Sequence, residues 1–271
     1  MNRTWIMTII PAAMIACVLL SIFCFRTAPT AVTVEAPIVV AINTGNPPME
    51  FRDPETTHLQ GFDIDLAGAI GRVSARPVKW VDSTFEQLIP TLMSGRANMI
   101  ISGFYDIPAR HALFDFIPYL TTGSQFYTSA EHDDIHTLTD LCGKTVTTIQ
   151  GTSFAEQVSR WSATNCEATG KPAIKVMWDS DLGQQLSNLR EGRSSAALHG
   201  QEVVAFIIGL RGGGHFHPIA PPINRTNIVA AFRKGDVKNE ALFSEALARL
   251  RQDHEFMTLA DKWNLSGSIN K

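Results

Sequence analysis

The 271-residue sequence predicts an α/β protein of two lobes, each a mostly parallel sheet flanked by helices, with two hinge strands joining the lobes. Three observations support this fold class. Short apolar runs rich in β-branched residues alternate with amphipathic helical patterns. The alternation occurs twice along the chain. The last fifty or so residues then repeat the pattern of the first part, and the length suits two modest domains.

Residues 1–37 are predicted to be a leader that does not belong to the fold. Arg3 precedes a mostly apolar run over residues 6–25, and a stretch rich in Pro, Thr and Ala follows. This order is typical of an export signal. The apolar run is also about long enough to span a bilayer, so an uncleaved anchor through residues 6–25 is the alternative. Either reading places the mature protein in the periplasm or at the cell surface.

Residues 38–126 are predicted to form the first part of lobe 1. The run at 38–42, IVVAI, reads as a buried strand. Asp63 is expected to be the N-cap of a helix that reaches residue 74. A strand at 78–81, a helix at 84–94 and a strand at 99–101 complete a β-α-β-α-β pattern.

Residues 127–220 repeat this pattern as lobe 2. Strands are expected at 145–149, 174–178 and 195–198, with helices at 154–163 and 182–191.

Residues 221–271 return to lobe 1 with a strand at 228–232 and helices at 239–253 and 255–263. Short crossings near 125–129 and 220–224 would let the cleft between the lobes close by a hinge.

The cysteines and the net charge limit which kinds of site and partner the chain can have. Cys142 and Cys166 are the two cysteines outside the leader, and in an oxidising compartment they are expected to form one disulfide. Two separate buried thiols are the alternative. The formal net charge of −3 and the lack of a Lys/Arg run argue against nucleic-acid binding. No Cys/His spacing indicates a metal site, and no cofactor is expected.

The most informative stretch is residues 95–119. Its short strand ends in the turn Ser102-Gly103, and Arg110 follows. Ligands of parallel sheets bind outside the carboxyl ends of the strands, where Asn43 and this turn are expected. The guanidinium of Arg110 suits a carboxylate because its planar fork donates two parallel hydrogen bonds.

Six motifs occur in an order that resembles a known family. They are GFDIDLAGAI (61–70), FEQLIPTLMSGRANMIISG (85–103), PARHALFDFIPYL (108–120), DLCGKTVTTIQGTS (140–153), LREGRSSAAL (189–198) and LADKWNLSGSI (259–269). Together they resemble the amino-acid-type periplasmic solute-binding proteins of ABC importers, extracellular solute-binding protein family 3. The resemblance implies the type II periplasmic binding protein fold, a small-molecule ligand held between two closing lobes, and a membrane permease as partner. We expect a monomer.

The resemblance also implies roles for individual residues. Arg110 would hold the α-carboxylate of the ligand, and Ser102 and Gly103 would donate to the same ligand. Phe85 would pack on the ligand side chain, and Thr152 would donate from lobe 2. His199 could donate into the cleft or be structural.

Three positions depart from the family pattern. Tyr105 stands where the family has Ser or Thr, Asn46 stands where it often has an aromatic residue, and Gly200 stands where an acidic residue pairs with the α-ammonium of the ligand. Either Glu202 or Asp106 supplies the missing carboxylate, or the ligand has no α-ammonium. The expected ligand is therefore an amino acid or a related small carboxylate, and a standard amino acid is not favoured.

Two other functions stay open. Exported cyclohexadienyl dehydratases share the fold and similar motifs, but they need a carboxyl general acid near Gly200. The absence of an acid at this position, and of any nucleophile constellation, predicts that the chain is not an enzyme. A sensory or degenerate binding protein with a non-amino-acid ligand is the other alternative.

Overall fold

The computed structural model describes residues 35–209 and 213–269. The leader and its anchor alternative therefore lie outside the described residues, apart from residues 35–37. Within the described part, none of the helices is both long enough and apolar enough to cross a bilayer.

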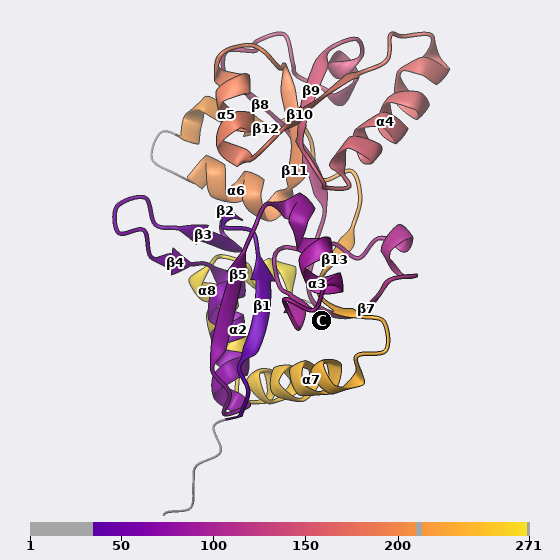
Figure 1. The fold of residues 1–271 in the computed structure, drawn as a ribbon. Helices are drawn as coiled ribbons and strands as arrows, with labels where there is room; N and C mark the ends of the chain where they lie inside the picture. The colour runs from indigo at the N-terminus through magenta and orange to yellow at the C-terminus, as the bar shows by residue number, and fades with distance from the viewer. Residues whose placement is uncertain (1–34, 210–212, 270–271) are drawn as a thin grey trace, which may run out of the picture. The chain divides into compact units, whose positions relative to one another are not determined.

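The first sheet has five strands in the order β5-β1-β6-β13-β7. They are β1 (Ile38–Ile42), β5 (Val78–Asp82), β6 (Met99–Ile100), β7 (Phe114–Thr122) and β13 (Thr226–Arg233). Figure 1 labels β1, β5, β7 and β13 of this sheet. Strand β1 pairs in parallel with β5 and β6, and β13 pairs antiparallel with β6 and β7. The three strands predicted for the first part of the chain are confirmed, and β13 confirms the return of the chain to this sheet.

Helices cover both faces of the first sheet. They are α2 (Phe62–Val73), α3 (Leu88–Met93), α7 (Val237–Gln252) and α8 (Glu255–Lys262), with the 3-10 turn η1 (Phe85–Gln87) before α3. Because side chains of a strand alternate between faces, Val40 and Ile42 pack with the apolar residues of α2, α7 and α8, whereas Ala41 packs with those of α3.

The predicted N-cap of α2 is wrong. The N-cap residue is Gly61, and Asp63 is the second residue of the first helical turn, fully buried. Its carboxylate accepts hydrogen bonds from the backbone N–H of Gly103, at 2.7 Å, and from the hydroxyl of Tyr119, at 2.8 Å. Tertiary donors, rather than the N–H groups of its own helix, therefore hold this side chain.

A small sheet lies in the segment that the sequence predicted only as a loop and its continuation. It consists of β2 (Gly45–Asn46), β3 (Glu50–Arg52) and β4 (Leu59–Gln60), paired antiparallel. These strands are two or three residues long and carry little hydrophobic periodicity, so no pattern marked them.

The second sheet has the strand order β10-β9-β11-β8-β12. Its strands are β8 (Ser124–Ser129), β9 (Thr145–Ile149), β10 (Lys175–Asp179), β11 (Ala196–Gly200) and β12 (Phe216–Pro218). Helix α4 (Phe154–Asn165) packs with one set of core residues, and α5 (Leu182–Arg190) and α6 (Gln201–Gly209) pack with another. The predicted alternation of strands and helices is confirmed here too. The segment expected to be the first crossing is instead strand β8.

The chain passes between the two sheets at two adjacent places. The first lies at Gly123, between β7 and β8, and the second lies in the segment between β12 and β13. The backbone N–H of Ser124 donates to Oδ1 of Asn224 at 2.9 Å. A Cβ on Gly123 would overlap the carbonyl oxygen of Asn224. The two crossings therefore lie side by side in contact, while the lobe boundaries themselves stay a prediction.

A disulfide joins Cys142 and Cys166, as predicted, with their Cα atoms 5.5 Å apart. It links the end of the 3-10 turn η3 (Leu138–Leu141) to the end of α4. The bridge thus ties α4 back to the segment that enters β9.

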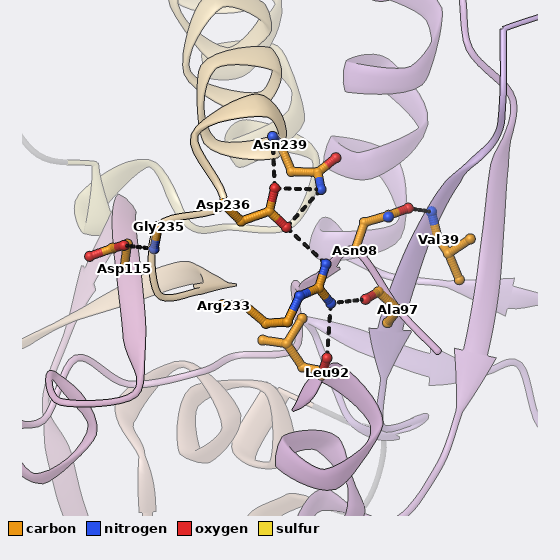
Figure 2. A network of polar contacts seen from close by, with 9 residues as sticks. All are labelled: Val39, Leu92, Ala97, Asn98, Asp115, Arg233, Gly235, Asp236 and Asn239. Atoms are coloured by element: carbon orange, nitrogen blue, oxygen red, sulfur yellow. Dashed lines mark hydrogen bonds and ion pairs between the residues drawn. The ribbon is translucent and has the colours of Figure 1, made fainter. Parts of the chain in front are cut away.

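Arg233 fixes the end of β13 to the turns around α3 (Figure 2). Its guanidinium donates to the carbonyl oxygens of Leu92, at 2.9 Å, and Ala97, at 2.7 Å, and pairs with Asp236 at 2.9 Å. Asp236 is the N-cap of α7 and accepts from the backbone N–H of Asn239. One side chain therefore bonds to a carbonyl in the last turn of α3 and to one in the loop after it, and orients the start of α7.

Candidate ligand-binding site

A small cavity lies between the first-sheet and second-sheet sides of the molecule. Its volume is about 40 Å³, which is room for a few water molecules. The lining residues come from both sides: Asn43, Gly45, Asn46, Phe85, Gly103, Tyr105, Arg110, Ile149, Thr152, Ser153, Phe154, His199 and Glu202. The sides touch at its edge, since a Cβ on Gly151 would lie 2.8 Å from Cα of Glu86. The cleft is therefore closed in this structure.

Arg110 is the cationic group of the cavity wall. It lies in the 3-10 turn η2 (Pro108–Arg110) and is only 8% exposed. One guanidinium nitrogen donates to the carbonyl oxygen of Tyr105 at 3.1 Å, and the guanidinium carbon lies 3.9 Å from the centre of the Phe104 ring. Burial lowers the pKa of Arg110 to about 10, so the group is still cationic at neutral pH. Among the described residues it forms no ion pair.

The turn at Ser102 and Gly103 uses its donors within the protein. The hydroxyl of Ser102 donates to Oε1 of Glu50 at 2.8 Å and accepts from the backbone N–H of Asn43. The backbone N–H of Gly103 donates to Asp63. Gly103 lines the cavity and Ser102 does not. The turn therefore shapes the wall, with both expected donors already engaged.

Glu50 and Asp63 form a buried acidic pair behind this turn, and both side chains are 0% exposed. Burial raises the pKa of Glu50 well above its usual value, and the nearby charge of Asp63 adds to the effect. Burial likewise raises the pKa of Asp63 to about 6. The Oε2 atom of Glu50 has no hydrogen-bond partner among the described residues. Each of the two carboxyls influences the pKa of the other, so they titrate as a pair.

Glu202 is the carboxylate that reaches the cavity. It lies in the first turn of α6 and is 6% exposed. Its Oε1 accepts from the hydroxyl of Tyr105 at 3.3 Å, and its Oε2 accepts from the hydroxyl of Thr122. Burial raises the pKa of Glu202, while these hydrogen bonds lower it. The other proposed carboxylate, Asp106, instead pairs with His111 at 2.5 Å and does not line the cavity.

Gly200 lies directly beneath this contact. A Cβ at position 200 would overlap both Oε1 of Glu202 and the hydroxyl oxygen of Tyr105. Gly200 therefore does not line the cavity itself, but its lack of a side chain makes room for the two groups that do. The ring of Tyr105 also packs edge-on against Phe154 across the cleft, with centroids 5.6 Å apart.

His199 presents a neutral ring. Its Nδ1 accepts from the backbone N–H of Gly200 at 2.8 Å, and burial lowers its pKa to about 3. The proton of the neutral ring is therefore on Nε2, which has no hydrogen-bond partner among the described residues. Thr152 also lines the cavity, although its hydroxyl donates to the carbonyl of Ile149 at 2.6 Å.

The remaining predicted residues also lie at the cavity. The ring of Phe85 stacks on Phe104 with centroids 6.0 Å apart, and the amide of Asn46 donates to Glu50 at 3.3 Å. Eight of the ten predicted residues line the cavity, and Ser102 and Gly200 lie just behind it. Sequence reasoning did not select Gly45, Ile149, Ser153 or Phe154. The last three flank Thr152 at the end of β9 and the start of α4, a position that could have indicated them.

The comparisons with known proteins identify the family of the chain. The model of the family described as bacterial extracellular solute-binding proteins, family 3, matches residues 38–266. The chain belongs to this family. The fold is accordingly the two-lobe type II periplasmic binding protein fold predicted from the sequence, with the two sheets as the cores of the lobes.

Individual relatives support the same assignment. Arginine-binding protein ArgT of Corynebacterium glutamicum is 27% identical over 66% of this chain, and the match spans 58% of that protein. A "Probable histidine-binding protein" of Campylobacter jejuni is 31% identical over 74% of this chain and 80% of its own length. The crystal structure of a mutant of ArgBP from T. maritima superposes with a TM-score of 0.75 and 26% identity, covering 83% of this chain and 94% of that one. These relatives are named as binding proteins.

Proposed function

We propose that this solute-binding protein is the substrate-binding component of an ABC importer and that it holds an amino acid or related small carboxylate between its closing lobes. The observation that carries the proposal is Arg110. It is a buried cation on the wall of the cleft and forms no ion pair among the described residues. A buried charge is costly unless it is paired, so a ligand carboxylate would be a strongly favoured partner.

Binding would join the two lobes. Lobe 1 supplies Arg110 and Phe85, and lobe 2 supplies Thr152 and His199, so a ligand in the cavity contacts both sides. A ligand that contacts both sides stabilises the closed form over the open one. We propose that the protein acts as a monomer in the periplasm or at the cell surface and presents the closed form to a membrane permease.

The cavity does not favour an arginine ligand, although several relatives carry arginine in their names. Arginine as a ligand has two cationic groups, its α-ammonium and its guanidinium. Glu202 is the only carboxylate among the described residues that line the cavity. One buried carboxylate cannot pair with both groups, so this cleft suits a smaller or less cationic ligand.

An exported dehydratase is the alternative from another class. Glu202 places a carboxyl beside Gly200, where such an enzyme needs a general acid, and burial raises its pKa. Its two oxygens, however, already bond to Tyr105 and Thr122. We propose binding without turnover. Steady conversion of prephenate or arogenate by the purified protein would move it to the enzyme class.

The test is a binding measurement on the Arg110→Ala variant. A thermal-shift screen of amino acids and small organic acids first identifies a ligand, because a ligand of the closed form raises the melting temperature. Loss of the charge-assisted pair should then weaken binding by about 2 kcal/mol, roughly thirtyfold. The control is Arg249→Ala, an exposed arginine on α7 away from the cavity. Unchanged carboxylate binding by Arg110→Ala would refute the docking scheme.

A further inference from the structure

The contact between Tyr105 and Glu202 fills the part of the cleft above Gly200. The phenol comes from lobe 1 and the carboxylate from lobe 2, and both groups would overlap a Cβ on Gly200. Thr122, at the end of β7, donates to the second oxygen of Glu202. Both oxygens of this buried carboxylate therefore have a neutral hydroxyl donor from the protein.

The hydroxyl of Tyr105 also occupies an acceptor position on Oε1 of Glu202, the carboxylate that lines the cavity. Tyr105 is 6% exposed, and its ring is held between lobes by the edge-on contact with Phe154. A ligand ammonium would compete with this hydroxyl for Oε1 of Glu202. Among the described residues that line the cavity there is no second carboxylate to receive it.

Two groups from opposite sides of the cavity can donate to a ligand. Arg110 offers its guanidinium from lobe 1, and His199 offers Nε2–H from lobe 2, since its Nδ1 already accepts from the backbone. Donors on both sides suit a ligand with acceptors on adjacent atoms. A 2-oxo acid has this pattern, with a carboxylate next to a carbonyl oxygen.

We infer that the cleft selects a small 2-oxo acid over the matching amino acid, because Tyr105, Thr122 and Glu202 satisfy one another where the family pattern places the acid that receives an ammonium. This inference rests on the proposed function, since it names the ligand class of the same site. It assigns Tyr105 and Gly200 as the residues that determine specificity.

The first experiment compares matched ligand pairs on the full-length chain by thermal shift and calorimetry. The pairs are phenylalanine with phenylpyruvate, leucine with 4-methyl-2-oxopentanoate, and glutamate with 2-oxoglutarate. Each pair keeps the side chain and changes only the α-substituent. At least one 2-oxo acid should bind ten times or more tighter than its amino acid. Tighter binding of the amino acids would overturn the inference and leave the proposed function intact. No binding by either series would overturn both.

The second experiment restores the family pattern with the double variant Tyr105→Ser/Gly200→Asp. Removing the phenol frees one of the two groups that a Cβ at position 200 would overlap, and the end of the Glu202 side chain must rotate aside for the other. Binding should then shift at least tenfold towards the amino acid of the pair. Tyr105→Phe is the conservative companion: it keeps the ring against Phe154 and removes the donor to Glu202, so it should narrow the preference for the 2-oxo acid. If both variants melt cooperatively and keep the preference of the parent protein, the assigned role of Tyr105 is wrong.

Discussion

The carboxylate of Glu202 occupies the space in which a side chain at position 200 would begin. Strand β11 ends at Gly200 and helix α6 starts at Gln201, so Glu202 follows Gly200 by two residues. The side chain of Glu202 turns back over the end of β11. The missing side chain at position 200 and the buried carboxylate at position 202 are thus one structural arrangement.

Substitution of Gly200 by Ala should destabilise the closed protein. The new methyl group would push Glu202 and Tyr105 out of their mutual contact, and overpacking of a filled site typically costs about 1–3 kcal/mol. Thermal melting would measure the loss. Gly68→Ala is the matched control: Gly68 is exposed within α2, a Cβ there meets nothing within 4 Å, and the change should be neutral or stabilising. Equal melting temperatures for the two variants would contradict this account.

Gly123→Ala should disturb the crossing between the sheets. Here a Cβ would overlap backbone rather than the end of a side chain, because the carbonyl oxygen of Asn224 lies against Gly123. The second crossing would have to move, and the hydrogen bond between Ser124 and Asn224 would weaken. We expect a loss of stability larger than that of Gly200→Ala, measured by denaturant unfolding. A variant as stable as the parent would show that the crossings can separate at little cost.

The buried pair of Glu50 and Asp63 should make stability depend on pH. Both pKa values are raised in the folded state, so the folded protein holds these protons more tightly than the unfolded chain. Their contribution is present at about pH 4 and is lost as the pH rises through about 6. Glu50→Gln removes one acid and offers an amide donor to Asp63.

The free energy of unfolding of the Glu50→Gln variant should therefore fall less than that of the parent protein between pH 4 and 7. Urea unfolding at several pH values would measure both. His199 acts in the opposite direction, because its lowered pKa reduces stability as the pH falls from 6.5 towards 3. It is unchanged in the variant, so the difference between the two curves isolates the acidic pair. The exposed Glu245, changed to Gln, is the control.

Removal of the disulfide should lower the free energy of unfolding by about 3 kcal/mol, from the entropy of a loop of this length in the unfolded chain. The double variant Cys142→Ala/Cys166→Ala avoids leaving a buried unpaired thiol. Its melting temperature should match that of the parent protein treated with a reductant, and the reductant should not lower it further. A reductant effect on the double variant would point to another cause.

Replacing Arg233 by Met should destabilise the protein without changing ligand affinity. The carbonyl of Ala97 would lose its donor from Arg233, the carbonyl of Leu92 would keep only the backbone N–H of Gly95, and Asp236 would lose its cation, at a cost of about 2–3 kcal/mol. Calorimetry should return the parent dissociation constant, because this network lies outside the cavity lining. Arg249→Met is the surface control.

The helices and the longer strands were predictable because the hydrophobic periodicity of the sequence indicates them. The runs that became β1 and β9 were found with their bounds, since a continuous β-branched segment between loops has few other interpretations. The small sheet of β2, β3 and β4 was missed, because strands of two or three residues show no period. The segment of β8 was taken as a crossing, since sequence does not show which sheet a strand joins.

The residues of the site were more predictable than their hydrogen-bond partners. The resemblance selected Arg110 by its motif, Tyr105 as a departure from the family pattern and Glu202 as one of two alternative carboxylates, and all three line one cavity. The resemblance did not show that the donors of Ser102 and Gly103 serve buried acids, because such pairing depends on Glu50 and Asp63 from distant elements. The partner of an internal acid is a tertiary property that no local pattern contains.

The turn at Ser102 and Gly103 is held by hydrogen bonds to those two acids in the absence of any ligand. The turn therefore loses its conformational freedom when the protein folds, not when a ligand binds. Docking of a ligand on lobe 1 then requires little further ordering of this turn. Capture by lobe 1 should then proceed at similar rates for different carboxylates. Discrimination would arise in the lifetime of the closed complex, which ends when the Tyr105 and Glu202 contact between the lobes breaks.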